Sequence, residues 1–241
     1  MTRRRFFAAG LLLLIGFMAV WFGRDSVLPP LAGWLDVGET PQPVTAVLPL
    51  PGDEHTRPFV AAAWVRTELA EAMLINQNEA SPDVEDGVAP PTHEIIRGVA
   101  EVRELDSSQI EMLDGASTST ADDLDQLDAY MNEHPDATVA VVTSEFHTRR
   151  TRWTIRHRYP DWSDRIVMVA APNPGFETPR WWWTDTGRRL IVSEYLKLGY
   201  YHLRYGNGRW VVGAAVVVVV ALLAVRRRRS SSERRVASGE K

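Results

Sequence analysis

Short apolar segments alternate along the chain with longer segments in which apolar residues recur at helical spacing. The short segments are rich in Val, Ile, Leu and Met, and the β-branched residues among them favour strands. The predicted strands are residues 44–48, 72–75, 110–113, 138–142 and 166–169. The predicted helices are residues 59–69, 92–104, 121–133, 146–158 and 187–201. Strands that alternate with helices predict βαβ units, and therefore an α/β, Rossmann-like three-layer fold with a mostly parallel sheet covered by helices on both faces.

Two further apolar runs, residues 6–22 and 210–225, lie outside this alternation, each beside a cluster of arginines. Each run is at or just below the usual membrane-spanning length of about 17–25 residues. Arginines stay on the cytoplasmic side, so both termini are predicted to be cytoplasmic and the main domain extracytoplasmic at the inner (plasma) membrane. A cleaved signal peptide is the alternative for the first run.

This pattern divides the chain into five parts. They are an N-terminal transmembrane anchor (1–24), an extended proline-containing linker (25–43), the α/β domain (44–205), a C-terminal transmembrane helix (206–226) and a basic cytoplasmic tail (227–241).

Charge and composition narrow the classes of partner. The chain has a formal net charge of −4, and the segment between the arginine clusters is more acidic still. An acidic body argues against nucleic-acid binding, which needs a basic face. The chain has no cysteine, which excludes disulfides and thiol chemistry. Phosphate-binding and dinucleotide-binding glycine fingerprints are absent, so the sequence identifies no cofactor.

The strongest chemical signal comes where the fourth predicted strand ends. Two hydroxyls, Thr143 and Ser144, are followed by His147 and Arg150 at the start of a predicted helix. Ligands of open parallel sheets bind outside the carboxyl ends of the strands, so these side chains are expected at a site. Histidine titrates near neutrality and can transfer a proton, and the planar guanidinium of arginine suits a carboxylate or a phosphate.

The run Val-Thr-Ser-x-x-His-x-x-Arg resembles the signature of the SanA/YdcF/ElyC-like family, domain of unknown function 218. The order of the other motifs, from about residue 31 to residue 205, is similar to that family as well. These motifs are Trp34-Leu35-Asp36-Val37, Arg57, Thr92-His93-Glu94, Ser119-Thr120-Ala121-Asp122, Trp181-Trp182 and Glu194-Tyr195. The glycines that the family usually carries after its first two strands are replaced here by Pro49-Leu50-Pro51-Gly52 and Ile75-Asn76-Gln77-Asn78.

The resemblance implies a role in maintaining the cell envelope, touching peptidoglycan or lipid-linked sugar metabolism, with an anionic or glycan-linked ligand. His147 would transfer a proton and Glu94 would be a second candidate catalytic residue, orienting His147 or Arg150. Arg57 and Arg150 would clamp the anion, and hydroxyls would orient the ligand. Those hydroxyls are Thr120, Thr143 and Ser144.

Several alternatives stay open at this point. The domain could be a scaffold without catalysis, or, if the topology were reversed, a cytoplasmic nucleotide-dependent enzyme. Thr120 could serve only as a helix cap, and Trp181–Trp183 are expected to pack or to lie near the membrane rather than to bind sugar. The arginines of the helix after strand four could neutralise the acidic helix before it or line an anion site. A metal site is not predicted, because Asp53, His55, His93 and His147 match no ligand spacing.

Overall fold

The computed structural model describes residues 16, 18, 22–175, 177–204 and 206. The chain forms two units, Met1–Glu194 and Tyr195–Lys241. The first unit contains the sheet and every residue of the candidate site. Of the second unit, the structure describes the C-terminal half of the last helix and Gly206.

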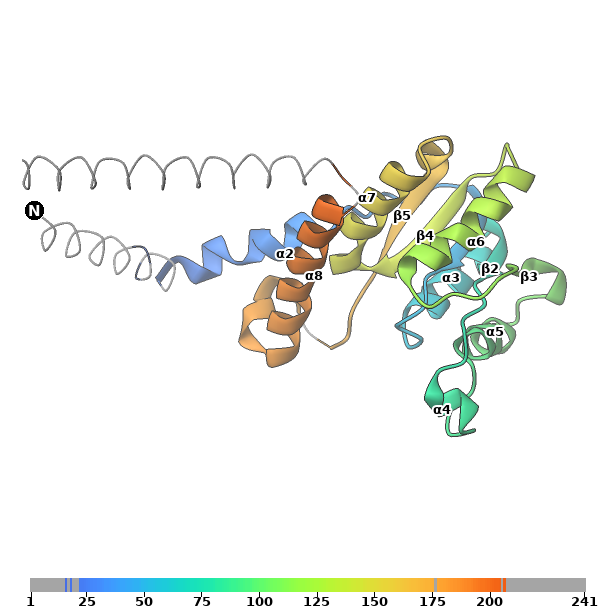
Figure 1. Ribbon diagram of the computed structural model, residues 1–241, viewed down its shortest axis with the longest axis horizontal. Helices are drawn as coiled ribbons and strands as arrows, with labels where there is room; N and C mark the ends of the chain where they lie inside the picture. The colour runs from blue at the N-terminus through green and yellow to red at the C-terminus, as the bar shows by residue number, and fades with distance from the viewer. Residues whose placement is uncertain (1–15, 17, 19–21, 176, 205, 207–241) are drawn as a thin grey trace, which may run out of the picture. The chain divides into compact units, whose positions relative to one another are not determined.

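A five-stranded parallel sheet forms the centre of the first unit, in the order β3-β2-β1-β4-β5 (Figure 1). The strands are β1 (Val44–Pro49), β2 (Ala70–Ile75), β3 (Ile110–Met112), β4 (Val139–Ser144) and β5 (Ile166–Ala171). Every pairing between neighbouring strands is parallel. The predicted α/β class with a parallel sheet is therefore confirmed.

The α-helices are α2 (Pro29–Leu35), α3 (Arg57–Arg66), α4 (Pro82–Glu85), α5 (Thr92–Val102), α6 (Thr120–Glu133), α7 (Thr148–Arg158) and α8 (Asp185–Arg204). Short 3-10 helices also occur: η1 (Ser107–Gln109), η2 (Glu145–His147), η3 (Ser163–Arg165) and η4 (Thr178–Trp183).

Successive side chains of each strand point to opposite faces of the sheet, and a hydrophobic core forms on each face. Val47 and Ala140 point into a cluster with α3 and α5, whereas Leu48 and Val141 point into a cluster with α6 and α7. Because successive strand residues face opposite sides, both faces of the central strands β1 and β4 are apolar, as in sheets covered on both sides. This is the predicted three-layer arrangement.

The linker prediction is wrong for residues 29–35, which form helix α2 rather than extended chain. Pro29 and Pro30 occupy its first turn, where the missing N–H of proline is harmless. Ala32 and Leu35 are buried, and Thr148 on α7 accepts a hydrogen bond from Val37 N (2.8 Å) and donates one to Leu35 O (3.0 Å). The segment before the sheet is thus packed on α7.

Trp181 is buried and donates from Nε1 to Leu28 O at 2.9 Å, so the expected packing role holds for it. Trp183 is exposed, with Arg180 over its ring.

No helix within the described ranges is long and apolar enough to cross a membrane. The predicted membrane segments, residues 6–22 and 210–225, lie outside those ranges, except for Gly16, Met18 and Phe22.

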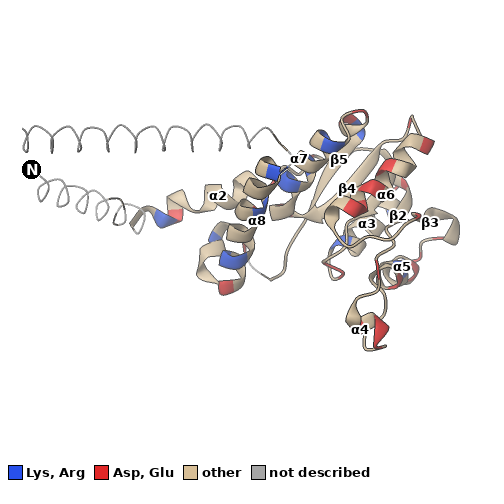
Figure 2. Ribbon diagram, viewed as in Figure 1, with Lys and Arg blue, Asp and Glu red and all other residues tan. Residues whose placement is uncertain are grey.

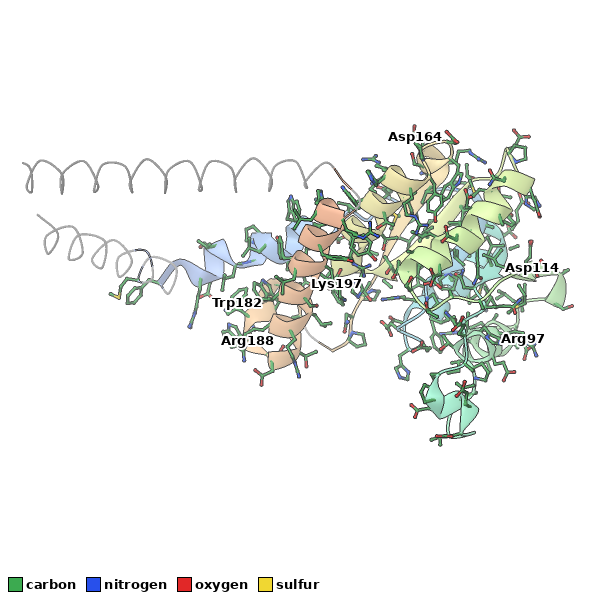
Figure 3. The ribbon with its side chains drawn as sticks, in the orientation of Figure 1. Arg97, Asp114, Asp164, Trp182, Arg188 and Lys197 are labelled. Atoms are coloured by element: carbon green, nitrogen blue, oxygen red, sulfur yellow. The ribbon has the colours of Figure 1, made fainter. Side chains whose placement is uncertain are left out.

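Acidic side chains gather on α6 and basic ones on α7 (Figure 2). Arg158 on α7 pairs with Asp125 on α6 at 3.0 Å, while Arg150 lies buried on the same helix. The expectation that the basic helix neutralises α6 therefore holds for Arg158, whereas Arg150 pairs with Glu194 instead, and the expectation of an anion site stays a prediction. Arg97 and Asp164 lie on the outside (Figure 3), and exposed pairs such as Arg97–Glu101 stabilise little.

Candidate functional site

The candidate site lies at the carboxyl edge of the sheet between β1 and β4. The chain runs from β1 outward to β2 and β3, then returns to the other side of β1 to form β4. Such a reversal leaves a crevice between the loops that follow the two central strands, which is where ligands of open α/β sheets bind. Arg57 of α3 spans this point by donating from Nη2 to Ser144 Oγ at 3.1 Å. Residues that follow β1 and β4 thus meet, as expected.

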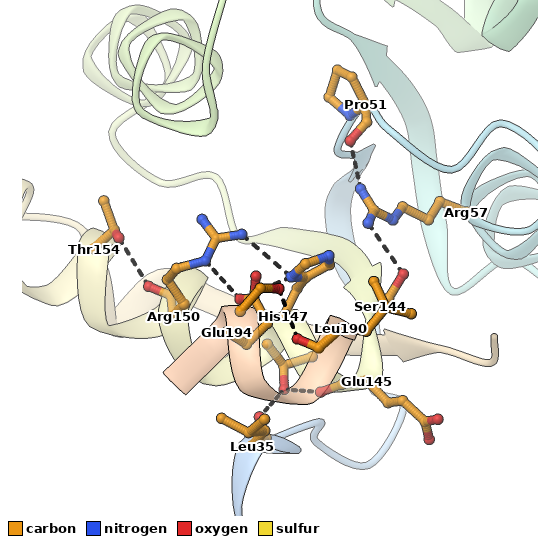
Figure 4. A network of polar contacts seen from close by, with 12 residues as sticks. Leu35, Pro51, Arg57, Ser144, Glu145, His147, Arg150, Thr154, Leu190 and Glu194 are labelled. Atoms are coloured by element: carbon orange, nitrogen blue, oxygen red, sulfur yellow. Dashed lines mark hydrogen bonds and ion pairs between the residues drawn. The ribbon is translucent and has the colours of Figure 1, made fainter. Parts of the chain in front are cut away.

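His147, Arg150 and Glu194 form a buried polar cluster at this edge (Figure 4). Glu194 Oε2 lies 2.9 Å from His147 Nδ1 and 2.7 Å from Arg150 Nε. Glu194 is 0% exposed, so both contacts are shielded from water. A carboxylate this close to Nδ1 favours the tautomer that carries its proton there. The second ring nitrogen, Nε2, is then the atom that accepts or donates a proton.

Burial sets the protonation states of this cluster. Desolvation lowers the pKa of His147, with further lowering from the positive charges of Arg150 and Arg57, and Glu194 offsets only part of this. His147 is therefore neutral at pH 7. Burial by itself would raise the pKa of Glu194, but its contacts with His147 and Arg150 lower it to about 2. The cluster thus holds an ionised carboxylate, a guanidinium and a neutral imidazole.

Arg57 is buried without a carboxylate partner. It is 4% exposed and donates from Nη1 to Leu50 O (2.9 Å) and Pro51 O (2.5 Å). It forms no ion pair with any described residue, and its Nε is buried without a hydrogen-bond partner. Desolvation lowers the pKa of Arg57 to about 10, although nearby Asp53 and Glu54 oppose that shift. A buried cation whose hydrogen bonds to the described residues all go to neutral oxygens is unusual and costly.

Arg57 and Arg150 face the same imidazole. Figure 4 shows the two guanidinium groups on either side of the His147 ring. The two positive charges repel each other, and the charge of Arg150 therefore helps to lower the pKa of Arg57. Glu194 pairs with Arg150 in this cluster, whereas Asp53 and Glu54 act on Arg57 without forming an ion pair with it.

The hydroxyls predicted to orient a ligand lie in different environments. Thr143 and Ser144 are both buried, and Ser144 accepts from Arg57 rather than being available to a ligand. Thr120 is half-buried at the start of α6, in the wall of an adjoining cleft. The expected N-cap at Thr120 is wrong by one residue, since Ser119 Oγ accepts from Asp122 N at 3.4 Å.

The adjoining cleft has a volume of about 530 Å³ and is open to solvent. Its walls come from the loop after β1, from residues 78–81 after β2, from the start of α5, and from residues 117–120 and Asp123 at the start of α6. Asp123 is 5% exposed and accepts from Ser117 Oγ at 2.7 Å. The sequence did not distinguish Asp123 from the other acidic residues of the same helix, so it was not predicted to lie at a site.

Glu94 is not the carboxylate at His147. It is exposed on the first turn of α5, and the carboxylate that contacts both His147 and Arg150 is Glu194. One signal in the sequence could have found it: Ile191, Glu194 and Leu198 share one helical face, so an acidic residue interrupts an apolar stripe.

A metal site does not form in the part of the chain that the structure describes. It contains no group of three or more His, Asp or Glu side chains able to hold an ion. Asp53, His55, His93 and His147 are therefore not gathered into one.

Asp123 gives the fold a pH dependence that can be measured. Burial raises its pKa to about 6, from 3.8. The folded state therefore binds this proton more tightly than the unfolded state, so its contribution to stability falls as pH rises from about 4 to about 6, by about 3 kcal/mol in all. Asp123→Asn is neutral throughout and should be up to about 3 kcal/mol more stable than wild type at pH 7.5. Urea unfolding at both ends of this pH range measures the difference. A gap between the two proteins that stays constant from pH 4 to pH 7.5 would contradict the assignment.

No family model matches the chain, and comparison with curated proteins finds no match.

Proposed function

We propose that the α/β unit binds a small anionic ligand at the edge formed by Arg57, His147 and Arg150. The observation that carries this proposal is Arg57, a buried guanidinium with no carboxylate partner and an unpartnered Nε. An anion between Arg57 and Arg150 would supply the missing acceptor and relieve the repulsion between them. One guanidinium can bind two oxygens of a phosphate or carboxylate at once. Two arginines beside the same imidazole could therefore share one anion.

Proton transfer by His147 is the chemistry that this arrangement supports best. Glu194 at Nδ1 leaves Nε2 toward the ligand side, and a neutral imidazole can take a proton there. The reaction would be the making or breaking of a bond beside the bound anion, with His147 as the general base or acid.

Binding of inorganic phosphate to the full-length chain in detergent tests the proposal. In isothermal titration, His147→Ala and Arg150→Ala should each weaken binding at least tenfold, because each removes a group facing the anion. His157→Ala and Arg156→Ala are matched controls, since both residues are exposed at the end of the same helix α7. Full binding by the first pair of variants would overturn the proposal.

The cellular setting we propose is the cell envelope, with the chain anchored by residues 1–24 and 206–226, the α/β unit extracytoplasmic and both termini cytoplasmic. Support comes from the arginine clusters beside the apolar runs and from the resemblance of the His147–Arg150 region to the SanA/YdcF/ElyC-like family. Reporter fusions after residue 120 and at the C-terminus should give opposite topology signals. The same signal from both would contradict the two-anchor arrangement.

A scaffold without catalysis is the second candidate, and one observation favours it. In place of glycines after β2, Asn76 and Gln77 are held by Gln126: Asn76 Nδ2 and Gln77 N donate to its Oε1 at 3.1 and 3.0 Å. Side chains thus occupy a loop where the resemblance implies an open backbone cradle. A scaffold would bind no phosphate, and surface substitutions on α6 would reduce capture of a specific partner while His147→Ala would not.

A further inference from the structure

The cleft beside Arg57 is lined by side chains unlike those of the arginine edge, and Pro51 belongs to both. Pro51 lines the cleft, and its carbonyl accepts from Arg57 Nη1. Asp123 also lines the cleft, and its negative charge raises the pKa of Arg57, opposing the effect of burial. Pro51 thus belongs both to the cleft wall and to the contacts of Arg57, and a ligand anchored on Arg57 would lie beside the cleft.

The walls of the cleft are polar and acidic. Three carboxylates, Glu54, Glu79 and Asp123, line it, and none of the side chains described there is basic. This set would repel a second anionic group. Apart from Pro51 and Ala80, the described walls carry no apolar side chain and no aromatic one, so neither an acyl chain nor a nucleobase finds a matching surface.

The hydrogen-bonding capacity of the cleft walls distinguishes a ligand hydroxyl from a ligand ammonium group. Hydroxyls such as those of Thr92 and Thr120 both donate and accept, and the carboxylates accept. An ammonium group only donates and would leave the hydroxyl protons unused, whereas a ligand hydroxyl matches both functions. Asn78 also lines the cleft, and its Oδ1 is buried without a hydrogen-bond partner, so it could accept a hydrogen bond from a ligand hydroxyl.

We propose that the ligand carries a neutral polyhydroxyl group next to its anion, as a sugar phosphate does. The anion would lie on the buried, unpartnered Nε of Arg57, and the hydroxyls would bond to Asp123 and Thr120 in the cleft. This inference rests on the proposed anion site and adds the class of the attached group. The volume of about 530 Å³ is within the range of small-molecule sites.

The test compares inorganic phosphate with phosphates attached to different groups, titrated into the full-length chain. The polyhydroxyl panel is glucose 1-phosphate, N-acetylglucosamine 1-phosphate and inositol 1-phosphate, and phosphoethanolamine represents an ammonium group. At least one polyhydroxyl phosphate should bind tenfold or more tighter than inorganic phosphate. Asp123→Asn should reduce that gain to less than threefold, where the gain is the ratio of the affinities of the same variant for the polyhydroxyl phosphate and for inorganic phosphate.

Thr120→Val keeps the shape of the side chain and should reduce the gain in affinity for the polyhydroxyl phosphate by about threefold. This variant replaces Asp123→Asn in the test if Asp123→Asn alters the fold. Glu133→Gln is the control: it removes an exposed charge at the far end of the same helix and should change neither affinity. Equal affinity for all polyhydroxyl phosphates and inorganic phosphate would overturn the inference but leave the anion site intact. A larger gain for phosphoethanolamine would assign the cleft to an ammonium group and also overturn it. Failure of every phosphate to bind would instead contradict the proposed function itself.

Discussion

Glu194→Gln is expected to lower the free energy of unfolding by about 3–5 kcal/mol, the usual consequence of removing one partner of a buried ion pair. Arg150 Nε lies 2.7 Å from Glu194 Oε2, and neither side chain has appreciable access to water. Glutamine keeps the shape but not the charge, so Arg150 would stay buried without its carboxylate. For a chain of this size the melting temperature should fall by roughly 6–20 °C. Thermal and urea unfolding measure the effect.

The pH dependence of this loss gives a second test. The pKa of Glu194 is lowered to about 2, so its contribution is complete above the unfolded value near 4.5 and is lost as pH falls from there toward 2. The difference in stability between wild type and Glu194→Gln should shrink over that interval. Glu133→Gln on α6 is the control and should stay within about 0.5 kcal/mol of wild type. A Glu194→Gln variant as stable as this control would refute the buried ion pair.

Arg57→Met is expected to weaken phosphate binding by roughly 100-fold, about 3 kcal/mol, because charge-assisted hydrogen bonds to the anion are lost. Its effect on stability should be smaller than that of Glu194→Gln. The three hydrogen bonds lost, to Leu50 O, Pro51 O and Ser144 Oγ, are offset by removal of a buried charge that forms no ion pair among the described residues. Calorimetric titration of phosphate together with urea unfolding separates the two effects.

Arg57→Lys distinguishes charge from geometry at the same position. Lysine keeps the charge but not the planar fork, so binding should fall by about tenfold rather than 100-fold. Arg66→Met is the matched control, because Arg66 is exposed in the last turn of the same helix α3. Phosphate affinity that is equal in Arg57→Met and Arg66→Met would show that Arg57 does not contact the anion.

The fold was predictable because its strands and helices differ in hydrophobic period. The predicted strand 138–142 and the observed β4 (Val139–Ser144) overlap, and the same holds for the other four strands. Helix α2 was missed because Pro29 and Pro30 suggest extended chain in the absence of tertiary contacts. In the folded unit, Ala32 and Leu35 gain a buried environment and Pro29 and Pro30 occupy the tolerated first turn.

The residues of the site that follow strand ends could be predicted from the sequence. The residue that reaches the site from a helix far along the chain could not. Arg57 and Ser144 follow two strands that end at the same edge, so their meeting could be expected from the parallel topology. Glu194 comes from a helix far along the chain, and no local rule places its carboxylate beside His147 and Arg150. Glu94 has the more conventional position at a helix start, where an acidic side chain favours the helix dipole without any ligand.

Asp123 is a second site residue whose environment depends on tertiary packing and could not be predicted from the sequence. Its neighbours Asp122 and Asp125 are exposed or paired at the surface, and the sequence does not separate it from them. Only the packing of α6 against the loop after β3 buries it and raises its pKa. A carboxylate kept in a place that destabilises the fold near neutral pH is consistent with a functional role.

The most direct test of an anion site at Arg57 and His147 is a crystal of the full-length chain soaked in tungstate, a phosphate-like anion with strong anomalous scattering. We predict an anomalous peak within hydrogen-bonding distance of Arg57 Nε and beside the His147 ring, absent from crystals of Arg57→Met. A crystal that binds tungstate elsewhere, or leaves this edge without a peak at saturating concentration, would contradict it.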